Sequence, residues 1–310
     1  MKQKVIAIVG PTAVGKTKLS IEVAKKINGE IISGDSMQVY KGMDIGTAKI
    51  KPEEMQGIPH HMIDIKEPNE DFSVADFQYY VQKYISEITS RNHIPIIVGG
   101  SGLYIQAVLN DYNFSNEKRD DALTKQLENE MEESGIELLF NRLKRLDPVQ
   151  ASRIHPNNYR RVIRALEIYE KTGLTMTEYQ QQQSKDSPYD SLLIGLEMER
   201  ELLYERINLR IDMMIRDGLL EEVKALMEQG FENYQSMKAI GYKELIPYFN
   251  GEAALEDSIH LLKRNSRRYA KRQYTWFKNK MDVNWYNFSA SSINEKFSDI
   301  FVDLAGFLNG

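Results

Sequence analysis

Short apolar runs alternate with amphipathic stretches over the first hundred residues of the chain. The runs at 5–9, 30–33 and 94–98 have the length and character of buried β-strands. Apolar side chains recur at helical spacing in residues 18–27 and 73–90, which lie between these runs. Strands that alternate with helices predict a parallel sheet built from βα units.

The pattern changes after about residue 111. Three stretches, 122–135, 136–146 and 157–172, predict helices, and no convincing strand accompanies them. The polar tract 179–185 then predicts a loop. An apolar core strand returns at 192–196, and the helical pattern resumes directly after it.

A phosphate-binding motif joins the first strand to the first helix. Residues 10–17 read Gly-Pro-Thr-Ala-Val-Gly-Lys-Thr and match G-x-x-x-x-G-K-[ST] in the strand–loop–helix context that the motif requires. In that context backbone N–H groups surround a diphosphate or triphosphate, Lys16 reaches the outer phosphates, and the Thr17 hydroxyl can hold Mg²⁺. The expected phosphate-binding residues are Gly10, Thr12, Ala13, Val14, Gly15, Lys16 and Thr17.

These patterns predict an α/β fold, a P-loop NTPase-like parallel sheet flanked by helices, with an all-α insertion domain. The expected core comprises residues 1–112 and 190–310, and the expected insertion comprises residues 113–189. In open α/β sheets ligands bind at the carboxyl ends of the strands, so the phosphate loop, residues 34–36 and residues 99–103 are expected to converge.

Composition narrows the possible chemistry. The chain has no cysteine, which excludes disulfides, thiolate catalysis and cysteine-ligated zinc. No apolar run approaches the roughly 20 residues of a membrane span, and the first strand leaves no room for a signal peptide. We therefore expect a cytoplasmic enzyme that does not bind membranes.

Asp35, directly after the second strand, is the carboxylate expected nearest to the phosphate loop. A P-loop hydrolase carries a metal-binding acid after the third predicted strand, but this chain has Gly99-Gly100 there, which argues against an ordinary nucleotide hydrolase. Asp35 alone is compatible with an Asx turn or helix cap, with a general base, or with the outer shell of a metal. His60-His61 favours packing or hydrogen bonds, because adjacent residues of an extended segment point to opposite faces.

Basic residues are segregated although the net charge is −5. Residues 258–281 hold eight basic side chains and no acidic one, arranged as two ladders of i,i+4 spacing, Lys263-Arg267-Lys271 and Arg264-Arg268-Arg272. Such ladders repel within a helix, and an anionic partner would offset that cost. The interleaved Tyr269, Tyr274, Trp276 and Phe277 either pack the helix on the core or join an RNA-binding surface.

The sequence pattern alone does not decide the role of the arginines at two further places. Arg160, Arg161 and Arg164 lie at helical spacing. They form either a solvated helix edge or a ridge that contacts phosphates. Arg210 has the pattern of an ordinary helix-surface charge.

Seven blocks of sequence together resemble the tRNA dimethylallyltransferase family, over nearly the whole chain and in the family's order. They are residues 10–17, 33–49, 59–64, 98–104, 160–167, 239–244 and 269–277. The family usually has Thr where this chain has Ser101, and Thr where it has Ser266. The zinc finger of eukaryotic relatives is missing, which resembles the bacterial type.

The resemblance implies transfer of the dimethylallyl group from dimethylallyl diphosphate to N6 of adenosine 37 in the tRNA anticodon loop, with Mg²⁺ as cofactor. The phosphate loop would then hold the diphosphate leaving group and not ATP. By the same resemblance Asp35 is the general base, Ser101 binds the adenine or Asp35, and Arg210 joins the diphosphate clamp. A monomer is the expected state.

The resemblance also implies a set of tRNA contacts, at the adenosine pocket, on the insertion and on the basic C-terminal helix. They are Asp35, Ser36, Met37, Gln38, Ser101, Arg160, Arg161, Val162, Ile163, Arg164, Arg267, Arg268, Lys271 and Arg272.

Three alternatives remain open from the sequence. A prenyltransferase that acts on free AMP would share the phosphate loop and Asp35, but would not need the insertion or the basic helix. A P-loop kinase would bind ATP and phosphorylate a metabolite. A non-catalytic RNA-binding protein would not need an intact Lys16, Thr17 and Asp35.

Overall fold

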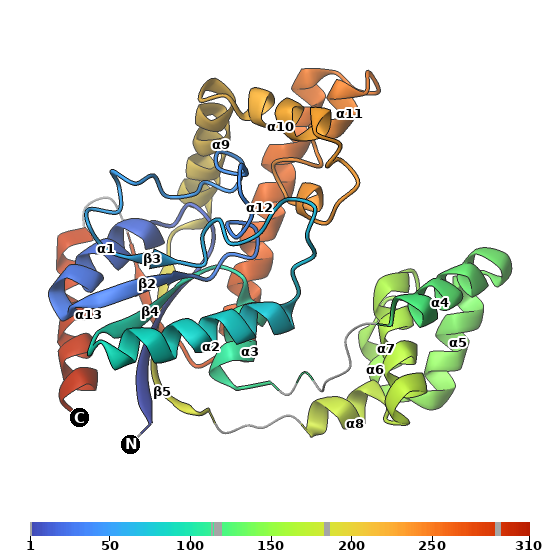
Figure 1. Cartoon of the computed structure of the whole chain (residues 1–310), viewed down its shortest axis with the longest axis horizontal. Coiled ribbons are helices and arrows are strands. Elements are labelled where there is room, and N and C mark those ends of the chain that lie inside the picture. The colour runs from blue at the N-terminus through green and yellow to red at the C-terminus, as the bar shows by residue number, and fades with distance from the viewer. Residues whose placement is uncertain (1, 113, 115–119, 183–186, 289–292) are drawn as a thin grey trace. The chain divides into compact units, whose positions relative to one another are not determined.

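The computed structural model describes residues 2–112, 114, 120–182, 187–288 and 293–310. The chain divides into two compact units, a core of Met1–Asp111 with Ser187–Gly310, and an insertion of Tyr112–Asp186 (Figure 1). Each unit is described by itself.

One parallel sheet of six strands forms the centre of the core in the described part of the chain, in the order β3-β2-β4-β1-β5-β6. The strands are β1 Gln3–Val9, β2 Gly29–Ser33, β3 His60–His61, β4 Ile94–Gly99, β5 Tyr189–Glu197 and β6 Asn284–Asn287. The inner strand β1 is buried throughout its second half, as its unbroken apolar run predicts. Its last residue, Val9, pairs with Gly99 and Gly195, which sets the phosphate loop beside the end of β4.

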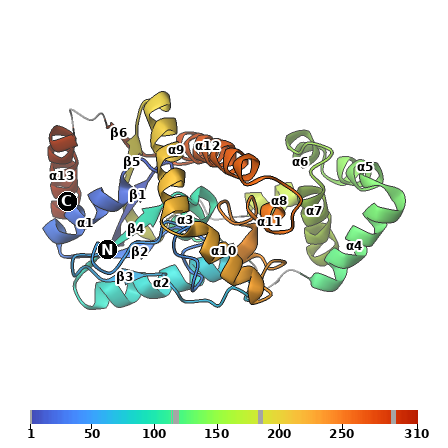
Figure 2. The same cartoon turned by 90° about the horizontal axis from the view of Figure 1, so that it is seen from above.

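Helices flank the sheet and extend beyond it. They are α1 Lys16–Ile27, α2 Val74–Ser90, α3 Gly102–Leu109, α9 Arg200–Arg216, α10 Leu219–Glu228, the 3-10 turn η1 Ser236–Lys238, α11 Ile246–Phe249, α12 Leu255–Lys280 and α13 Ile293–Asn309. Helix α1 ends at Asn28 in the left-handed conformation, and α2 begins at a capping box of Ser73 and Asp76. Helix α12 packs along α9, and the two run side by side in Figure 2.

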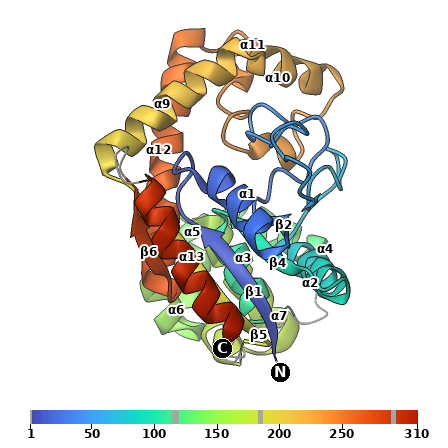
Figure 3. The same ribbon diagram turned by 90° about the vertical axis from the view of Figure 1, so that its left-hand side faces the viewer.

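The two ends of the core unit lie next to each other. Helix α13 packs against β5, and Lys4 of β1 donates from Nζ to the backbone oxygens of Phe307 (2.8 Å) and Leu308 (3.1 Å) near the end of α13 (Figure 3). Helix α13 therefore covers the sheet beside its central strand.

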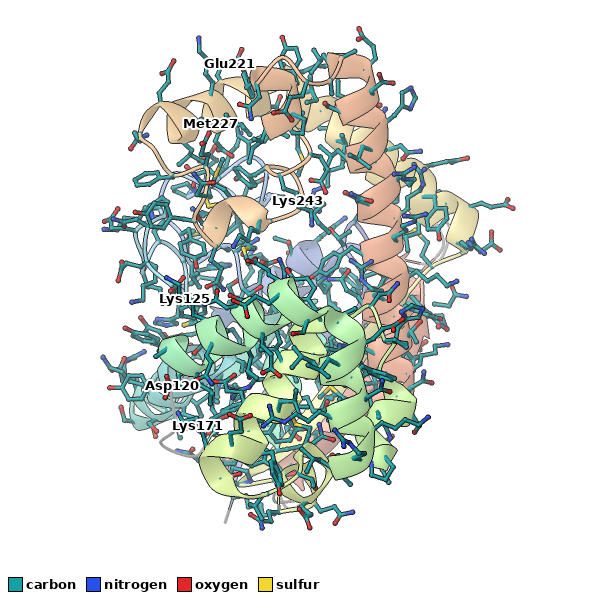
Figure 4. All side chains as sticks on the ribbon, turned by 90° about the vertical axis from the view of Figure 1, so that its right-hand side faces the viewer. Asp120, Lys125, Lys171, Glu221, Met227 and Lys243 are labelled. Atoms are coloured by element: carbon teal, nitrogen blue, oxygen red, sulfur yellow. The ribbon has the colours of Figure 1, made fainter. Side chains whose placement is uncertain are left out.

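The insertion is helical in all of its described elements. They are α4 Asp121–Ser134, α5 Ile136–Leu146, α6 Pro148–Arg153, α7 Tyr159–Thr172 and α8 Met176–Gln181. Leu127, Leu139, Leu143 and Leu166 belong to an apolar core that is separate from the core under the sheet. Exposed side chains such as Lys125 cover the outer face of α4 (Figure 4).

The structure confirms the predicted fold class and corrects four details. The strands β3 and β6 and the helix α6 are absent from the sequence prediction, because each is short and only partly apolar. The predicted loop at 179–185 is wrong for residues 179–181, since a capping box of Thr175 and Glu178 starts a helix that includes them. Residues 183–185 of that tract lie outside the described residues. None of the described helices has the length and apolar character of a membrane span.

Candidate active site

The loop of residues 10–17 has the conformation of an anion-binding turn. Ala13 and Gly15 have positive φ angles of 66° and 109°, which turn successive N–H groups toward one side. Gly10 is required by close approach, because a Cβ there would lie 2.6 Å from the Leu196 carbonyl oxygen. The Lys16 ammonium donates to the backbone oxygens of Gly10 (3.0 Å) and Pro11 (2.8 Å). Lys16 thus lies folded over its own loop.

A cavity of about 420 Å³ opens beside this loop. Its polar wall includes Lys16, Thr17, Asp35, Gln38 and Arg210. Apolar side chains form another part of the wall: Ile31, Ile50, Ile63, Val98, Leu209 and Met213. The cavity therefore offers cations and N–H groups to phosphates together with an apolar surface.

A second cavity of about 250 Å³ adjoins the first. Its wall includes Ser36 and Met37 after β2, and residues 239–241 of the predicted block 239–244. Asp35, Arg210 and Tyr269 border both cavities. Two ligands bound in these cavities would consequently meet at Asp35.

Asp35 and Arg210 lie at this junction with Lys16 beside them in the first cavity, and burial shifts the pKa of all three. Burial, assisted by the charge of Arg210, lowers the pKa of Lys16 to about 7. Burial also lowers the pKa of Arg210, against the attraction of Asp35. Burial raises the pKa of Asp35, although the Met37 amide and the two cations favour its ionised form. The site is thus a poorly solvated cluster of two cations and one anion.

The structure confirms the Asx turn at Asp35, while its roles as general base or in the outer shell of a metal stay predictions. Its Oδ1 accepts a hydrogen bond from the Met37 N–H (2.8 Å), which is the Asx turn, and its carboxylate borders both cavities. Ser101, unlike Asp35, is not among the residues that line either cavity. Its Oγ is buried, and the side chain lies against Tyr269, which borders both cavities.

Sequence reasoning missed Gln273 and Glu222. The Gln273 side chain accepts a hydrogen bond at Oε1 from the Thr12 N–H (2.9 Å) and borders the first cavity. Gln273 follows Tyr269 by one helical turn, so the spacing of these two polar residues is the only signal in the sequence. Burial and the nearby Asp35 carboxylate raise the pKa of Tyr269 to about 12.

Glu222, on the helix α10 whose Glu221 and Met227 are labelled in Figure 4, binds a turn of backbone. Its carboxylate accepts from the N–H groups of residues 44, 45 and 46 at 2.9, 2.8 and 3.0 Å, and from the Tyr242 hydroxyl at 2.6 Å. The next residues, Thr47 and Ala48, line both cavities. Glu222 therefore holds the backbone that leads into the wall shared by the two cavities. Its hydrogen-bond partners are too distant in the sequence for this role to be predicted.

The basic ladders of α12 divide between the protein and solvent. Lys263 pairs with Asp212 (2.6 Å) and Arg267 donates to Asn208 (2.6 Å), both on α9, so these two residues have partners within the chain. Part of the repulsion within the ladders is therefore offset inside the chain, and an anionic partner for the remaining basic residues stays a prediction. The exposed basic side chains are Arg264, Arg268, Lys271 and Arg272.

The aromatic residues of α12 pack the helix on the core. Phe277 is fully buried, and the Trp276 ring lies so close to Gly102 that a Cβ there would be 2.3 Å from it. The structure thus supports the packing interpretation for these two residues.

The predicted arginine ridge of the insertion is exposed. Arg160, Arg161 and Arg164 are all exposed on α7, and Arg164 also pairs with the buried Glu167 (2.9 Å). Val162 and Ile163, expected among the RNA contacts, are buried in the core of the insertion, because they lie on the opposite face of the amphipathic helix. In this stretch the arginines, and not these apolar side chains, face solvent, and the tRNA contacts stay a prediction.

His60 and His61 form hydrogen bonds, as expected. His60 Nδ1 contacts the Ile58 carbonyl (2.8 Å), and His61 Nε2 contacts the buried Glu30 carboxylate (2.7 Å). Glu30 also binds Arg91 through two nitrogens, and His93. Burial alone would raise the pKa of Glu30, but these hydrogen bonds lower it to about 2.

The fold and the two adjoining cavities define a P-loop enzyme that places a carboxylate between a phosphate-binding cavity and a second ligand site. A family model described as IPP transferase matches residues 38–280. The chain belongs to this family, which confirms the resemblance found in the seven blocks.

Individual relatives cover almost the whole chain. A tRNA dimethylallyltransferase of Oceanobacillus iheyensis is 61% identical over 308 residues, 99% of this chain and 98% of the relative. The structure of the tRNA isopentenylpyrophosphate transferase of Bacillus halodurans is 51% identical, with a TM-score of 0.77 over 99% of this chain and 97% of that one. A eukaryotic dimethylallyltransferase acting on tRNA is 34% identical, with a TM-score of 0.83 over 97% of this chain and 77% of that one.

Proposed function

We propose that the protein transfers the dimethylallyl group of dimethylallyl diphosphate to N6 of adenosine 37 in tRNA, and that the reaction takes place where its two cavities meet. The observation that carries this proposal is that Asp35 and Arg210 border both the phosphate-loop cavity and the second cavity. Family membership supplies the reaction. We expect a cytoplasmic monomer.

The first cavity suits the prenyl diphosphate. Loop N–H groups, Lys16 and Arg210 provide positive charge for the diphosphate, and apolar residues such as Ile63 and Met213 provide a surface for the five-carbon group. Breaking the C1–O bond leaves an additional negative charge on the departing diphosphate. Preorganised donors in a poorly solvated site stabilise that charge more in the transition state than in the ground state.

The second cavity suits the adenosine. The N6 nitrogen forms a bond to C1 of the prenyl group while the C1–O bond breaks, and N6 loses one proton. Asp35 accepts that proton at a carboxylate oxygen, and its raised pKa makes it a better base than an exposed aspartate. The buried Ser101 hydroxyl lies in the segment after β4 and beside Tyr269, and we assign it to bind the adenine or Asp35.

The oxygen donors of the first cavity fit Mg²⁺. Mg²⁺ keeps several waters and takes one or two protein ligands together with phosphate oxygens. The Thr17 hydroxyl and the Asp35 carboxylate both border this cavity, so Thr17 would hold the ion directly and Asp35 through water. Bound there, Mg²⁺ would neutralise charge on the diphosphate.

The exposed cations suit the phosphates of an anticodon stem-loop. Arg268, Lys271 and Arg272 are exposed on the helix that carries Tyr269 at the cavities, and the Arg272 guanidinium lies over the Tyr269 ring. Arg160 and Arg161 add exposed charge on the insertion. A flipped, unpaired base is accessible to a pocket of this kind.

One reaction tests the proposal. Purified protein is incubated with unmodified tRNA that carries adenosine 37, dimethylallyl diphosphate and Mg²⁺, without ATP, and the digested nucleosides are analysed by mass spectrometry. We expect N6-isopentenyladenosine, and its loss with an Asp35→Asn variant that still binds tRNA. Prenylation of AMP in preference to tRNA would indicate an AMP prenyltransferase instead, and a requirement for ATP would indicate a kinase.

A further inference from the structure

Gln273 joins the long basic helix α12 to the phosphate loop. Its side chain is buried, with 5% of the residue exposed. Its Oε1 accepts the hydrogen bond from the Thr12 N–H at 2.9 Å, across 261 residues of sequence. The hydrogen bond takes up one loop N–H group, so a bound diphosphate has to use the N–H groups that follow Thr12.

The amide also fills the space beside the end of β4. A Cβ on Gly100 would lie 2.0 Å from Gln273 Nε2 and 2.9 Å from its Cδ, so only glycine leaves room for the amide. This is the region in which a P-loop hydrolase carries its metal-binding acid. Here a neutral amide from a distant helix packs against the loop and the strand end.

One helix face therefore serves two parts of the site. Tyr269, one turn before Gln273, borders both cavities, while Gln273 binds the phosphate loop. The exposed face of the same helix carries Arg268, Lys271 and Arg272. A change in the position of α12 would thus be transmitted to the loop backbone through the Gln273–Thr12 hydrogen bond.

We propose that Gln273 is a positioning residue for the diphosphate: it sets the geometry of the phosphate loop from α12, and it acts without touching the transferred group. The proposal rests on the function proposed above. It predicts that removal of the Gln273 acceptor weakens diphosphate binding while the tRNA surface of α12 is preserved.

Inorganic diphosphate in the presence of Mg²⁺ is the probe, and calorimetry gives its Kd for the full-length protein. In Gln273→Leu the Thr12 N–H loses the acceptor that orients the loop, and we expect the Kd to rise about 10- to 100-fold. The Kd for unmodified tRNA, measured by filter binding, should stay within about twofold of the wild-type value. Thr275→Ala, an exposed change on the same helix, is the control and should alter neither constant.

Gln273→Glu separates positioning from simple loss of packing. The carboxylate keeps an acceptor for the Thr12 N–H but adds a negative charge beside the diphosphate. We expect weaker binding than wild type at pH 8, and recovery toward the wild-type Kd as the pH falls and the glutamate becomes protonated. These Kd values are compared with the wild-type Kd at the same pH, and by this measure Gln273→Leu should show no recovery. Where Gln273→Leu folds poorly, the pH dependence of Gln273→Glu relative to wild type decides the matter.

The outcomes are distinct. Failure of the wild-type protein to bind diphosphate would overturn the proposed function and this inference with it. A second outcome would overturn the inference alone: the wild-type protein binds diphosphate, and a folded Gln273→Leu variant binds it with a Kd within threefold of wild type. Equal losses of diphosphate and tRNA affinity would also overturn it, because they would show a general disturbance of α12.

Discussion

Binding of dimethylallyl diphosphate should be linked to protonation of Lys16. The pKa of Lys16 is about 7, because the ammonium is buried beside Arg210. A lowered pKa means that the empty site disfavours the charged lysine, and an anionic ligand reverses this by favouring it. The protein should therefore take up a proton when the diphosphate binds at a pH above 7.

The pKa gives the size of the effect. At pH 8 about nine-tenths of the Lys16 side chains are neutral, so about 0.9 proton should be taken up per ligand if the complex restores an ordinary lysine pKa. Between pH 7 and pH 9 the charged fraction falls from about one half to about one hundredth. The Kd should consequently rise about 50-fold over this interval.

Calorimetry in buffers of different ionisation enthalpy measures the proton uptake directly. The ligand is dimethylallyl diphosphate, and tRNA is left out. The terminal phosphate of dimethylallyl diphosphate is already ionised at pH 8, since such groups titrate near pH 6. Lys16→Arg is the matched control, because an arginine stays charged over the whole interval while Asp35 is unchanged. Exposed Lys18→Met should behave as the wild type does.

A flat Kd between pH 7 and pH 9 in the wild type, or proton uptake that persists in Lys16→Arg, would refute the reasoning. The first result would mean that Lys16 is charged in the free protein. The second would mean that another group, with Asp35 as the nearest, carries the linkage.

Three further results are expected. Asp35→Asn should lower kcat about 10²- to 10⁴-fold and leave the tRNA Kd within twofold, whereas a kcat near wild type would remove Asp35 as the base. Glu30→Gln should lower the free energy of unfolding by about 3 kcal/mol at pH 7, because the pKa of Glu30 is about 2 against an ordinary 4.5. The stabilisation by Glu30 is complete above pH 4.5 and disappears as the pH falls toward 2. Urea unfolding at pH 7 and pH 3 checks this, and equal midpoints at pH 7 would contradict it. Arg268→Gln with Arg272→Gln should weaken tRNA binding and reduce its salt dependence by about two units of slope at most, and an unchanged slope would place the tRNA elsewhere.

The parts of the site that follow directly from local sequence could be predicted. The phosphate loop is one contiguous motif, and its conformation depends on residues within it, such as Gly15. Asp35 could be placed because a residue at the carboxyl end of a parallel strand lies at the ligand edge of the sheet. The predicted βα units and the helices of the insertion are confirmed for the same reason, since their apolar periodicity is local.

The remaining parts depend on side chains that meet only after folding. Gln273 and Glu222 bind backbone N–H groups far away in the sequence, and such a bond leaves no periodic pattern. The ladder of α12 contains Lys263 and Arg267, whose partners on α9 could not be seen from the helix alone. Charge spacing therefore indicated a basic surface, but it included two residues that have polar partners within the chain.

The strand order has a consequence for the synthesis of this protein. The central strand β1 ends at Val9 and pairs along its full length with β5, which begins at Tyr189. At about 5–20 residues per second a ribosome needs roughly ten to forty seconds to supply the second strand after the first.

Until then the apolar edge of β1 is open, whereas the insertion between the two strands is a contiguous stretch with its own core. The insertion can therefore fold on the nascent chain before the sheet closes. Its folding would shorten the chain that separates β1 from β5, and a mutation that unfolds it would leave an unpaired strand exposed for longer.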